Sequence, residues 1–133
     1  MAFSGPESDR LAIRELYGTY SDCATRLDRD GWLALYVPEG EWHIRGEQAC
    51  GHAALGALWD ELLAGITAMG FFAEIGALEI SGDTARGRVS CREIFQLENG
   101  RIHKVVGQYE DLLVRTAGDW RFARRQYTVL LRE

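Results

Sequence analysis

The chain has 133 residues, of which 47% are hydrophobic and 26% charged, and its formal net charge at pH 7 is −5. These proportions are ordinary for a soluble globular protein and predict one domain over residues 1–133. The negative charge argues against a nucleic-acid partner, since phosphates attract surfaces rich in Lys and Arg. No apolar run approaches the roughly 20 residues that span a bilayer, and no signal-peptide pattern precedes the first helix, so we expect a cytoplasmic protein without a membrane partner.

The first part of the chain is predicted to be helical. Residues 4–7, Ser-Gly-Pro-Glu, have capping-box spacing and a proline that a helix start tolerates. Apolar residues then recur at helical spacing as far as Leu27. Asp28 or Asp30 is expected to cap a short second helix, which Pro38 would end.

A short strand is predicted over residues 41–45, and Gly51 is expected to open a third amphipathic helix. From Glu74 onward, apolar and polar residues alternate with a period of two, and turns at 81–83, 98–100 and 116–119 divide this part into four strands. Helices followed by a meander predict an α+β fold: a curved antiparallel sheet closed by three N-terminal helices around one pocket.

Glu93 is the most informative residue, because it shares the apolar face of its strand. That face comprises Val89, Cys91, Glu93, Phe95 and Leu97. A buried carboxylate without a partner costs several kcal/mol, so two interpretations remain open. Desolvation would raise the pKa of Glu93 and make it a general acid or base. Alternatively, Glu93 forms an inert ion pair with Arg125 of the last strand.

The strands before the C-terminus supply further candidates for the pocket. Arg125 belongs to the more apolar face of the last strand, which is predicted to comprise Ala123, Arg125, Tyr127, Val129 and Leu131. Asp111 is predicted to be a second inward acid, and His103 to lie at a wet rim. Other side chains are predicted to donate to a ligand or to form apolar wall; they are Tyr20, Tyr109, Tyr127, Trp42 and Phe71.

Metal and cofactor chemistry find little support in the sequence. The three histidines share no ligand spacing, and no glycine-rich phosphate loop or nucleophile elbow is present. We therefore expect no metal and no cofactor. Cys23, Cys50 and Cys91 are each predicted to be a small buried thiol in a reducing compartment.

Several segments resemble the SnoaL-like branch of the nuclear-transport-factor-2-like superfamily. The resemblance lies in residues 12–17, 27–30, 36–42, 107–111 and 118–125, and so extends over nearly the whole chain. It implies a cone-shaped α+β barrel around a mostly apolar pocket, commonly dimeric through the sheet. Members include dehydratases, dehydrochlorinases, ketosteroid isomerases and non-catalytic binding modules, so the resemblance is specific for fold and weak for activity.

The catalytic set of the dehydratase-like and dehydrochlorinase-like relatives is only partly present. Those relatives use an aspartate–histidine pair as general base, helped by an arginine. By register, the resemblance implies that the aspartate position falls on Thr25 and the histidine position on Phe71, whereas the arginine position is kept as Arg125. The usual base is therefore expected to be missing, and Thr25 is assigned only to substrate binding.

The expected function is that of a small-molecule lyase or isomerase acting on a hydrophobic or carbonyl-containing ligand, in a homodimer. Glu93, with Asp111, would move the proton, and Arg125 and a tyrosine hydroxyl would stabilise the oxyanion. The alternative is a non-catalytic module of the same fold that binds a small hydrophobic acid through Arg125. A dimerisation domain with a filled pocket is a third possibility.

Overall fold

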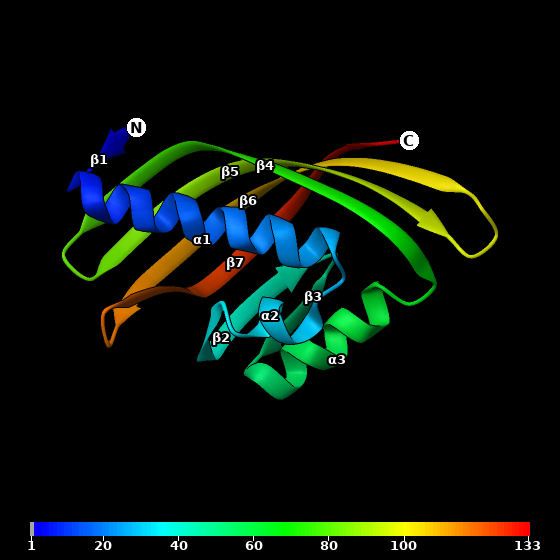
Figure 1. The fold of residues 1–133 in the computed structure, drawn as a ribbon, viewed down its shortest axis with the longest axis horizontal. Coiled ribbons are helices and arrows are strands. Elements are labelled where there is room, and N and C mark those ends of the chain that lie inside the picture. Colours follow the sequence, from blue (N-terminus) through cyan, green and yellow to red (C-terminus); the bar gives the residue numbers. More distant parts are fainter. Residues whose placement is uncertain (1) are drawn as a thin grey trace.

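The computed structural model describes residues 2–133, which fold into a curved sheet with three helices (Figure 1). The helices are α1 (Glu7–Thr25), α2 (Arg29–Leu33) and α3 (His52–Leu62). The strands are β1 (Phe3–Ser4), β2 (Tyr36–Ile44), β3 (Glu47–Cys50), β4 (Ile66–Ser81), β5 (Thr84–Leu97), β6 (Ile102–Thr116) and β7 (Asp119–Arg132). The α+β class predicted from the sequence is confirmed.

The seven strands form one mixed sheet in the order β1-β4-β5-β6-β7-β2-β3. Strands β4 to β7 are the predicted antiparallel meander, but β1 joins β4 and β2 joins β7 in parallel. The prediction of a wholly antiparallel sheet is therefore wrong for the β1–β4 and β2–β7 pairs. The sheet is also open, because β1 and β3 stand at its two ends and the strands do not close into a barrel (Figure 1).

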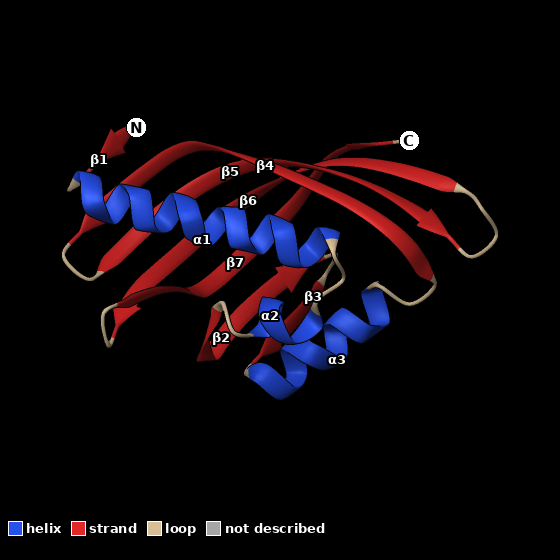
Figure 2. Cartoon of the chain, in the orientation of Figure 1, coloured by secondary structure: helices blue, strands red, loops and turns tan. Residues whose placement is uncertain are grey.

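The helices lie on one side of this sheet (Figure 2). Helix α1 packs on β4 and β7 and buries Ile13, Tyr17 and Tyr20 against the sheet. Its apolar stripe recurs at three- and four-residue intervals, which places these side chains on one helical face. Within residues 2–133, no helix is long and apolar enough to cross a membrane.

The local start and stop signals are partly confirmed. Asp28 caps α2, because its carboxylate accepts a hydrogen bond from the backbone N–H of Gly31 at 3.0 Å. Helix α1 begins after Pro6 without a side-chain cap, so the predicted capping box is not formed. Pro38 does not end α2, which stops at Leu33; it lies in β2, where the register with β7 is irregular and a missing N–H is tolerated.

One long strand also starts earlier than its pattern indicates. Strand β4 begins at Ile66, before the alternation that is visible from Glu74. Residues 66–73 are almost all apolar or small, so apolar and polar residues do not alternate there and the period-two signal is missing.

Two bulges in β7 change which side chains face the interior. The first bulge is at Ala123, which has no partner on β6 because its neighbours Phe122 and Arg124 pair with the consecutive residues Leu113 and Leu112. The second is at Leu130, whose neighbours Val129 and Leu131 pair with Gly107 and Val106. One extra residue moves the following side chains to the other face of a strand.

The predicted inner face of β7 is therefore correct only in its middle. Arg125, Tyr127 and Val129 face inward as expected, but Phe122, not Ala123, is fully buried at one end. At the other end, Leu131 is 61% exposed, and Arg132 takes the inward position.

Candidate functional site

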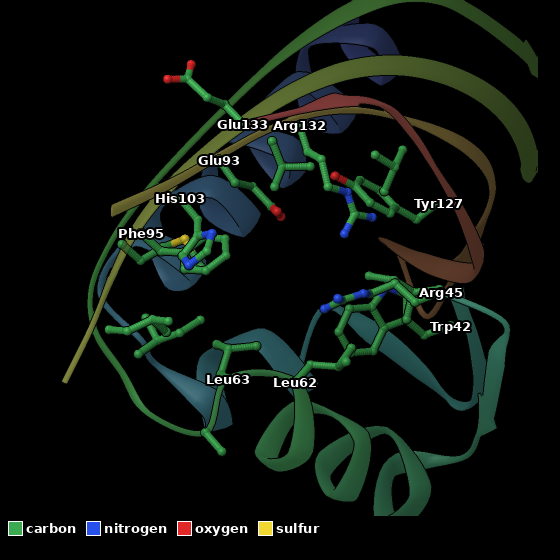
Figure 3. A pocket seen from close by; sticks show the side chains of 17 residues that line it. Trp42, Arg45, Leu62, Leu63, Glu93, Phe95, His103, Tyr127, Arg132 and Glu133 are labelled. Atoms are coloured by element: carbon green, nitrogen blue, oxygen red, sulfur yellow. The ribbon is translucent and has the colours of Figure 1, made fainter. Parts of the chain in front are cut away.

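A cavity of about 370 Å³ opens between the end of α3, the β2–β3 hairpin and the inner faces of β4 to β7. Its walls are mostly apolar, and they carry five ionisable side chains and one phenol (Figure 3). The apolar part comprises Trp42, Ile44, Leu62, Leu63, Ala64, Ile66, Met69, Phe95, Leu97, Val105 and Val129. The polar part comprises Arg45, Glu93, His103, Tyr127, Arg132 and Glu133. A small apolar ligand with one polar group suits this lining.

Glu93 projects from β5 into the cavity (Figure 3). Burial raises the pKa of its carboxyl from 4.5 to about 7, and the nearby charge of Arg45 opposes this rise only in part. Among residues 2–133, no ion pair involves Glu93. Of the two interpretations left open by the sequence, the ion pair with Arg125 is wrong, because Arg125 pairs with Asp111 instead. The desolvated carboxyl stays a prediction, and the raised pKa of Glu93 agrees with it.

Arg125 pairs with Asp111. The two face each other across β6 and β7, and the guanidinium donates to both carboxylate oxygens, at 2.8 and 2.9 Å. The Tyr17 hydroxyl donates to the same carboxylate at 2.5 Å. Burial raises the pKa of Asp111, whereas the Arg125 charge and these hydrogen bonds act in the opposite direction.

The pair is sealed from solvent and from the cavity. Arg125 is 1% exposed and Asp111 5%, and neither lines the cavity. The guanidinium lies over the ring of Tyr109, at 3.6 Å from its centroid, and over that of Tyr20, at 4.3 Å. The sequence thus correctly placed both groups in the interior, but the structure does not bring them together with Glu93. Tyr17, the third member of this cluster, was visible only as part of the helical stripe of α1.

The aromatic residues predicted for the pocket divide between the cavity wall and the core behind it. The Trp42 indole N–H donates to the Tyr109 hydroxyl at 3.2 Å, and the hydroxyls of Tyr20 and Tyr109 lie 3.4 Å apart. Of these three, only Trp42 lines the cavity. Tyr127 also lines it, and its buried hydroxyl has no hydrogen-bond partner among residues 2–133. Burial, followed by the adjacent Glu93 carboxylate, raises the pKa of Tyr127.

Thr25 and Phe71 lie side by side, away from the cavity wall. The Phe71 backbone N–H donates to the Thr25 hydroxyl oxygen at 3.0 Å, joining the end of α1 to β4. The Phe71 ring packs on Tyr20, and Phe71 is the direct cross-strand partner of Glu93. A base at position 93 therefore lies one strand away from position 71.

Three other polar residues reach the cavity. His103 comes from β6 and stacks on Phe95, with ring centroids 5.5 Å apart. Arg45 lies in the β2–β3 turn, and Arg132 ends β7. Sequence reasoning missed both arginines, because a turn has no alternation and the bulge at Leu130 reverses the alternation before Arg132. Within residues 2–133, no group of three or more His, Cys, Asp or Glu side chains is placed to hold a metal ion.

Comparison with known proteins agrees with this architecture. The family model described as SnoaL-like domain matches residues 7–126. The chain belongs to the SnoaL-like family. Its fold is that of the nuclear-transport-factor-2-like superfamily. No curated protein matches the sequence of this SnoaL-like chain.

Three solved bacterial proteins illustrate the structural similarity. A provisional scytalone dehydratase from Novosphingobium aromaticivorans has a TM-score of 0.88 at 21% identity, covering 95% of this chain and 87% of its own. A ketosteroid isomerase-like protein from Erwinia carotovora has a TM-score of 0.84 at 20% identity, and the match covers 95% of this chain and 99% of that protein. A hexachlorocyclohexane dehydrochlorinase from Novosphingobium barchaimii has a TM-score of 0.84 at 17% identity, and the match covers 95% of this chain and 89% of that protein. At these identities the likeness establishes the SnoaL-like fold, and the activity has to be inferred from the site.

Proposed function

We propose that this protein is a small-molecule lyase or isomerase in which Glu93 is the general base. The observation that carries the proposal is the unpaired Glu93 carboxyl in an apolar cavity, with a pKa of about 7. A base whose pKa lies near the working pH is about half ionised and still binds protons strongly. The SnoaL-like family supports the reaction type, since its structural neighbours include dehydratase, dehydrochlorinase and ketosteroid isomerase-like proteins.

The proposed chemistry begins with a proton on a carbon next to a carbonyl group. The Glu93 carboxylate takes this proton, and the C–H electron pair moves onto the carbonyl oxygen, giving an enolate. The Tyr127 hydroxyl, which is buried at the cavity wall without a protein partner, donates a hydrogen bond to that oxygen.

The enolate has two outcomes. In an isomerase, protonated Glu93 returns the proton to a different carbon of the same molecule. In a lyase, the enolate expels a leaving group, which departs with its electron pair, and Glu93 later releases the proton to water. Both outcomes need only one base and one donor. His103, at the cavity wall near Phe95, is available as a second polar contact to the ligand.

A positioning role suits Arg125 and Asp111 better than the catalytic role predicted for them, because neither reaches the cavity. Arg125 lies over Tyr109, whose hydroxyl accepts from Trp42, and Trp42 forms cavity wall. The buried pair therefore acts on the ligand through the side chains in front of it. Tyr20, Thr25 and Phe71 belong to the same supporting layer by their contacts.

The test uses simple carbonyl compounds whose reactions need only proton transfer, namely a β,γ-unsaturated cyclic ketone for isomerisation and a β-hydroxy ketone for dehydration. Wild-type protein should convert one of them, with kcat/KM rising with pH through an apparent pKa near 7. Glu93→Gln should lower kcat/KM by about 10²- to 10⁴-fold, the usual contribution of a general base. The exposed strand residue Glu74 provides the matched control, Glu74→Gln, with unchanged turnover. Equal turnover by Glu93→Gln and wild type would contradict the mechanism.

A second candidate function is a non-catalytic module that binds a small hydrophobic ligand. It is favoured by Thr25 and Phe71, which cannot transfer protons as an aspartate–histidine pair does. Such a module would bind the ketones above without converting them, and Glu93→Gln would leave their dissociation constants nearly unchanged.

We also propose that the protein is a single-domain, cytoplasmic homodimer that associates through the outer face of the sheet. Phe72, Ile102 and Leu131 lie on the face opposite the cavity and are 56%, 53% and 61% exposed. Exposed apolar side chains gathered on one face are typical of an interface between proteins. Light scattering of the purified chain, compared with a Phe72→Gln variant, tests this association.

A further inference from the structure

We propose that the natural ligand of this cavity is a small apolar carboxylic acid, whose carboxylate binds Arg45 and Arg132 while its apolar body lies against Glu93. This inference deepens the proposed function and rests on the same cavity. It assigns to Arg45 and Arg132 the anion-binding role that the sequence had suggested for Arg125.

The strand register places Arg132 opposite Glu93 in the cavity. Val105 of β6 pairs with Glu93 on one side and with Arg132 on the other, so the two side chains leave the same face of the sheet. They are separated by two strand spacings, about 10 Å at the backbone. Figure 3 shows the Arg132 guanidinium and the Glu93 carboxyl both pointing into the cavity, whereas the Glu133 carboxyl points away from it.

Arg45 approaches from the opposite wall. It lies in the turn between β2 and β3, and its side chain extends into the cavity beside Trp42 (Figure 3). It is close enough to lower the pKa of Glu93 but forms no ion pair with it. Among residues 2–133, neither Arg45 nor Arg132 has an ion-pair partner, so both guanidinium groups are free to bind a ligand.

The charge and shape of the cavity favour an anion with a hydrocarbon body. Two guanidinium groups face it, while Glu93 is partly protonated near neutral pH and Glu133 is turned outward. Guanidinium groups match carboxylates geometrically and hold them with charge-assisted hydrogen bonds. A cationic ligand would instead be repelled by both arginines. The apolar walls from α3, β5 and β7 leave room for a ring or short chain beyond the carboxylate.

Anchoring the acid in this way would also orient the reaction. A ligand held by its carboxylate at the two arginines has to extend its body along the apolar wall toward Glu93. Fixing the reacting C–H bond next to the base is one of the larger sources of rate acceleration. The arginines thus select the substrate, and Glu93 acts on it.

The test compares naphthalene-2-carboxylate with 2-naphthamide, which has nearly the same shape but no charge. Dissociation constants are measured by calorimetry at pH 7 for wild type, Arg45→Gln and Arg132→Gln. The control is Arg124→Gln, which removes an exposed arginine of β7 that faces away from the cavity. Wild type should bind the carboxylate at least about tenfold more tightly than the amide, the effect of one charge-assisted contact.

Each cavity variant should weaken carboxylate binding by about tenfold and leave amide binding unchanged, and Arg124→Gln should change neither. Equal affinity for the two probes, no carboxylate binding, or a carboxylate-to-amide ratio unaffected by both cavity variants would each overturn the inference.

Failure of this inference can be told apart from failure of the proposed function, because binding requires no turnover. Glu93→Gln should keep or strengthen the preference for the carboxylate, since it removes a nearby negative charge. If that preference is present and ketone turnover does not depend on Glu93, the ligand class stands and the general-base mechanism fails. If turnover depends on Glu93 and the preference is absent, the mechanism stands and the ligand class fails.

Discussion

Replacing Glu93 by glutamine should stabilise the protein in a strongly pH-dependent way. The carboxyl is held in an apolar cavity, and burial raises its pKa from 4.5 to about 7. Glutamine has nearly the same shape and does not ionise. The substitution therefore removes the cost of burying the charge while leaving the packing of β5 almost unchanged.

The sign and size follow from the two pKa values. Below pH 4.5, Glu93 is protonated in both the folded and the unfolded chain, and its burial carries no charge penalty. Between pH 4.5 and about 7, only the unfolded chain ionises, so the wild-type protein loses stability as the pH rises. Above pH 7 the loss is complete. At about 1.4 kcal/mol for each pH unit between the two pKa values, it amounts to about 3 kcal/mol.

The measurement is urea-induced unfolding of wild type, Glu93→Gln and the control Glu74→Gln at pH 5 and pH 9. Apart from any pH-independent effect of the amide, the unfolding free energy of Glu93→Gln should exceed that of wild type by about 3 kcal/mol at pH 9. At pH 5 the corresponding difference should be less than about 1 kcal/mol. Glu74 is exposed on β4, so its variant should follow wild type at both pH values. A difference between Glu93→Gln and wild type that is the same at pH 5 and pH 9 would refute the desolvated carboxyl.

Two further substitutions probe the layer behind the cavity. Asp111→Asn leaves the Arg125 guanidinium buried without its counter-ion. It should therefore lower the unfolding free energy, measured in urea at pH 7, by about 3–5 kcal/mol. A loss below about 1 kcal/mol would contradict the buried pair. Gly107→Ala would place a methyl group against the Tyr127 ring and hydroxyl, and should cost about 1–3 kcal/mol and weaken binding of the naphthalene probe. Gly76→Ala meets only ordinary contact distances and serves as its control, so equal effects of the two alanines would count against this packing.

Local patterns were sufficient for much of the fold. The alternation in β5 identified Glu93 as an inward acid, and Asp28 was correctly expected to cap a short helix. The turn at Asn99-Gly100 joins two long strands, as an Asn-Gly pair between alternating segments predicts. These features depend on neighbours within a few residues, so the sequence alone carries them.

The candidate site was less accessible to the same reasoning. Asp111 and Arg125 were both expected inside, yet the partner of Arg125 depends on the β6–β7 register, which pairs it with Asp111 and separates it from Glu93. The inward position of Arg132 depends on the bulge at Leu130, for which the sequence offers no clear signal.

By itself, then, the sequence determined the helices, the meander and the inward direction of Glu93, because backbone geometry imposes periods of 3.6 and 2 on any amphipathic element. The fold family was indicated separately, by the resemblance of several segments to SnoaL-like proteins. Only the tertiary structure decided which charges meet, which strands pair in parallel and which residues line the cavity. Those outcomes depend on strand register and bulges, which long-range packing fixes, and a shift of one residue reverses every side chain that follows. The same bulge turned Leu131 outward and brought Arg132 to the cavity.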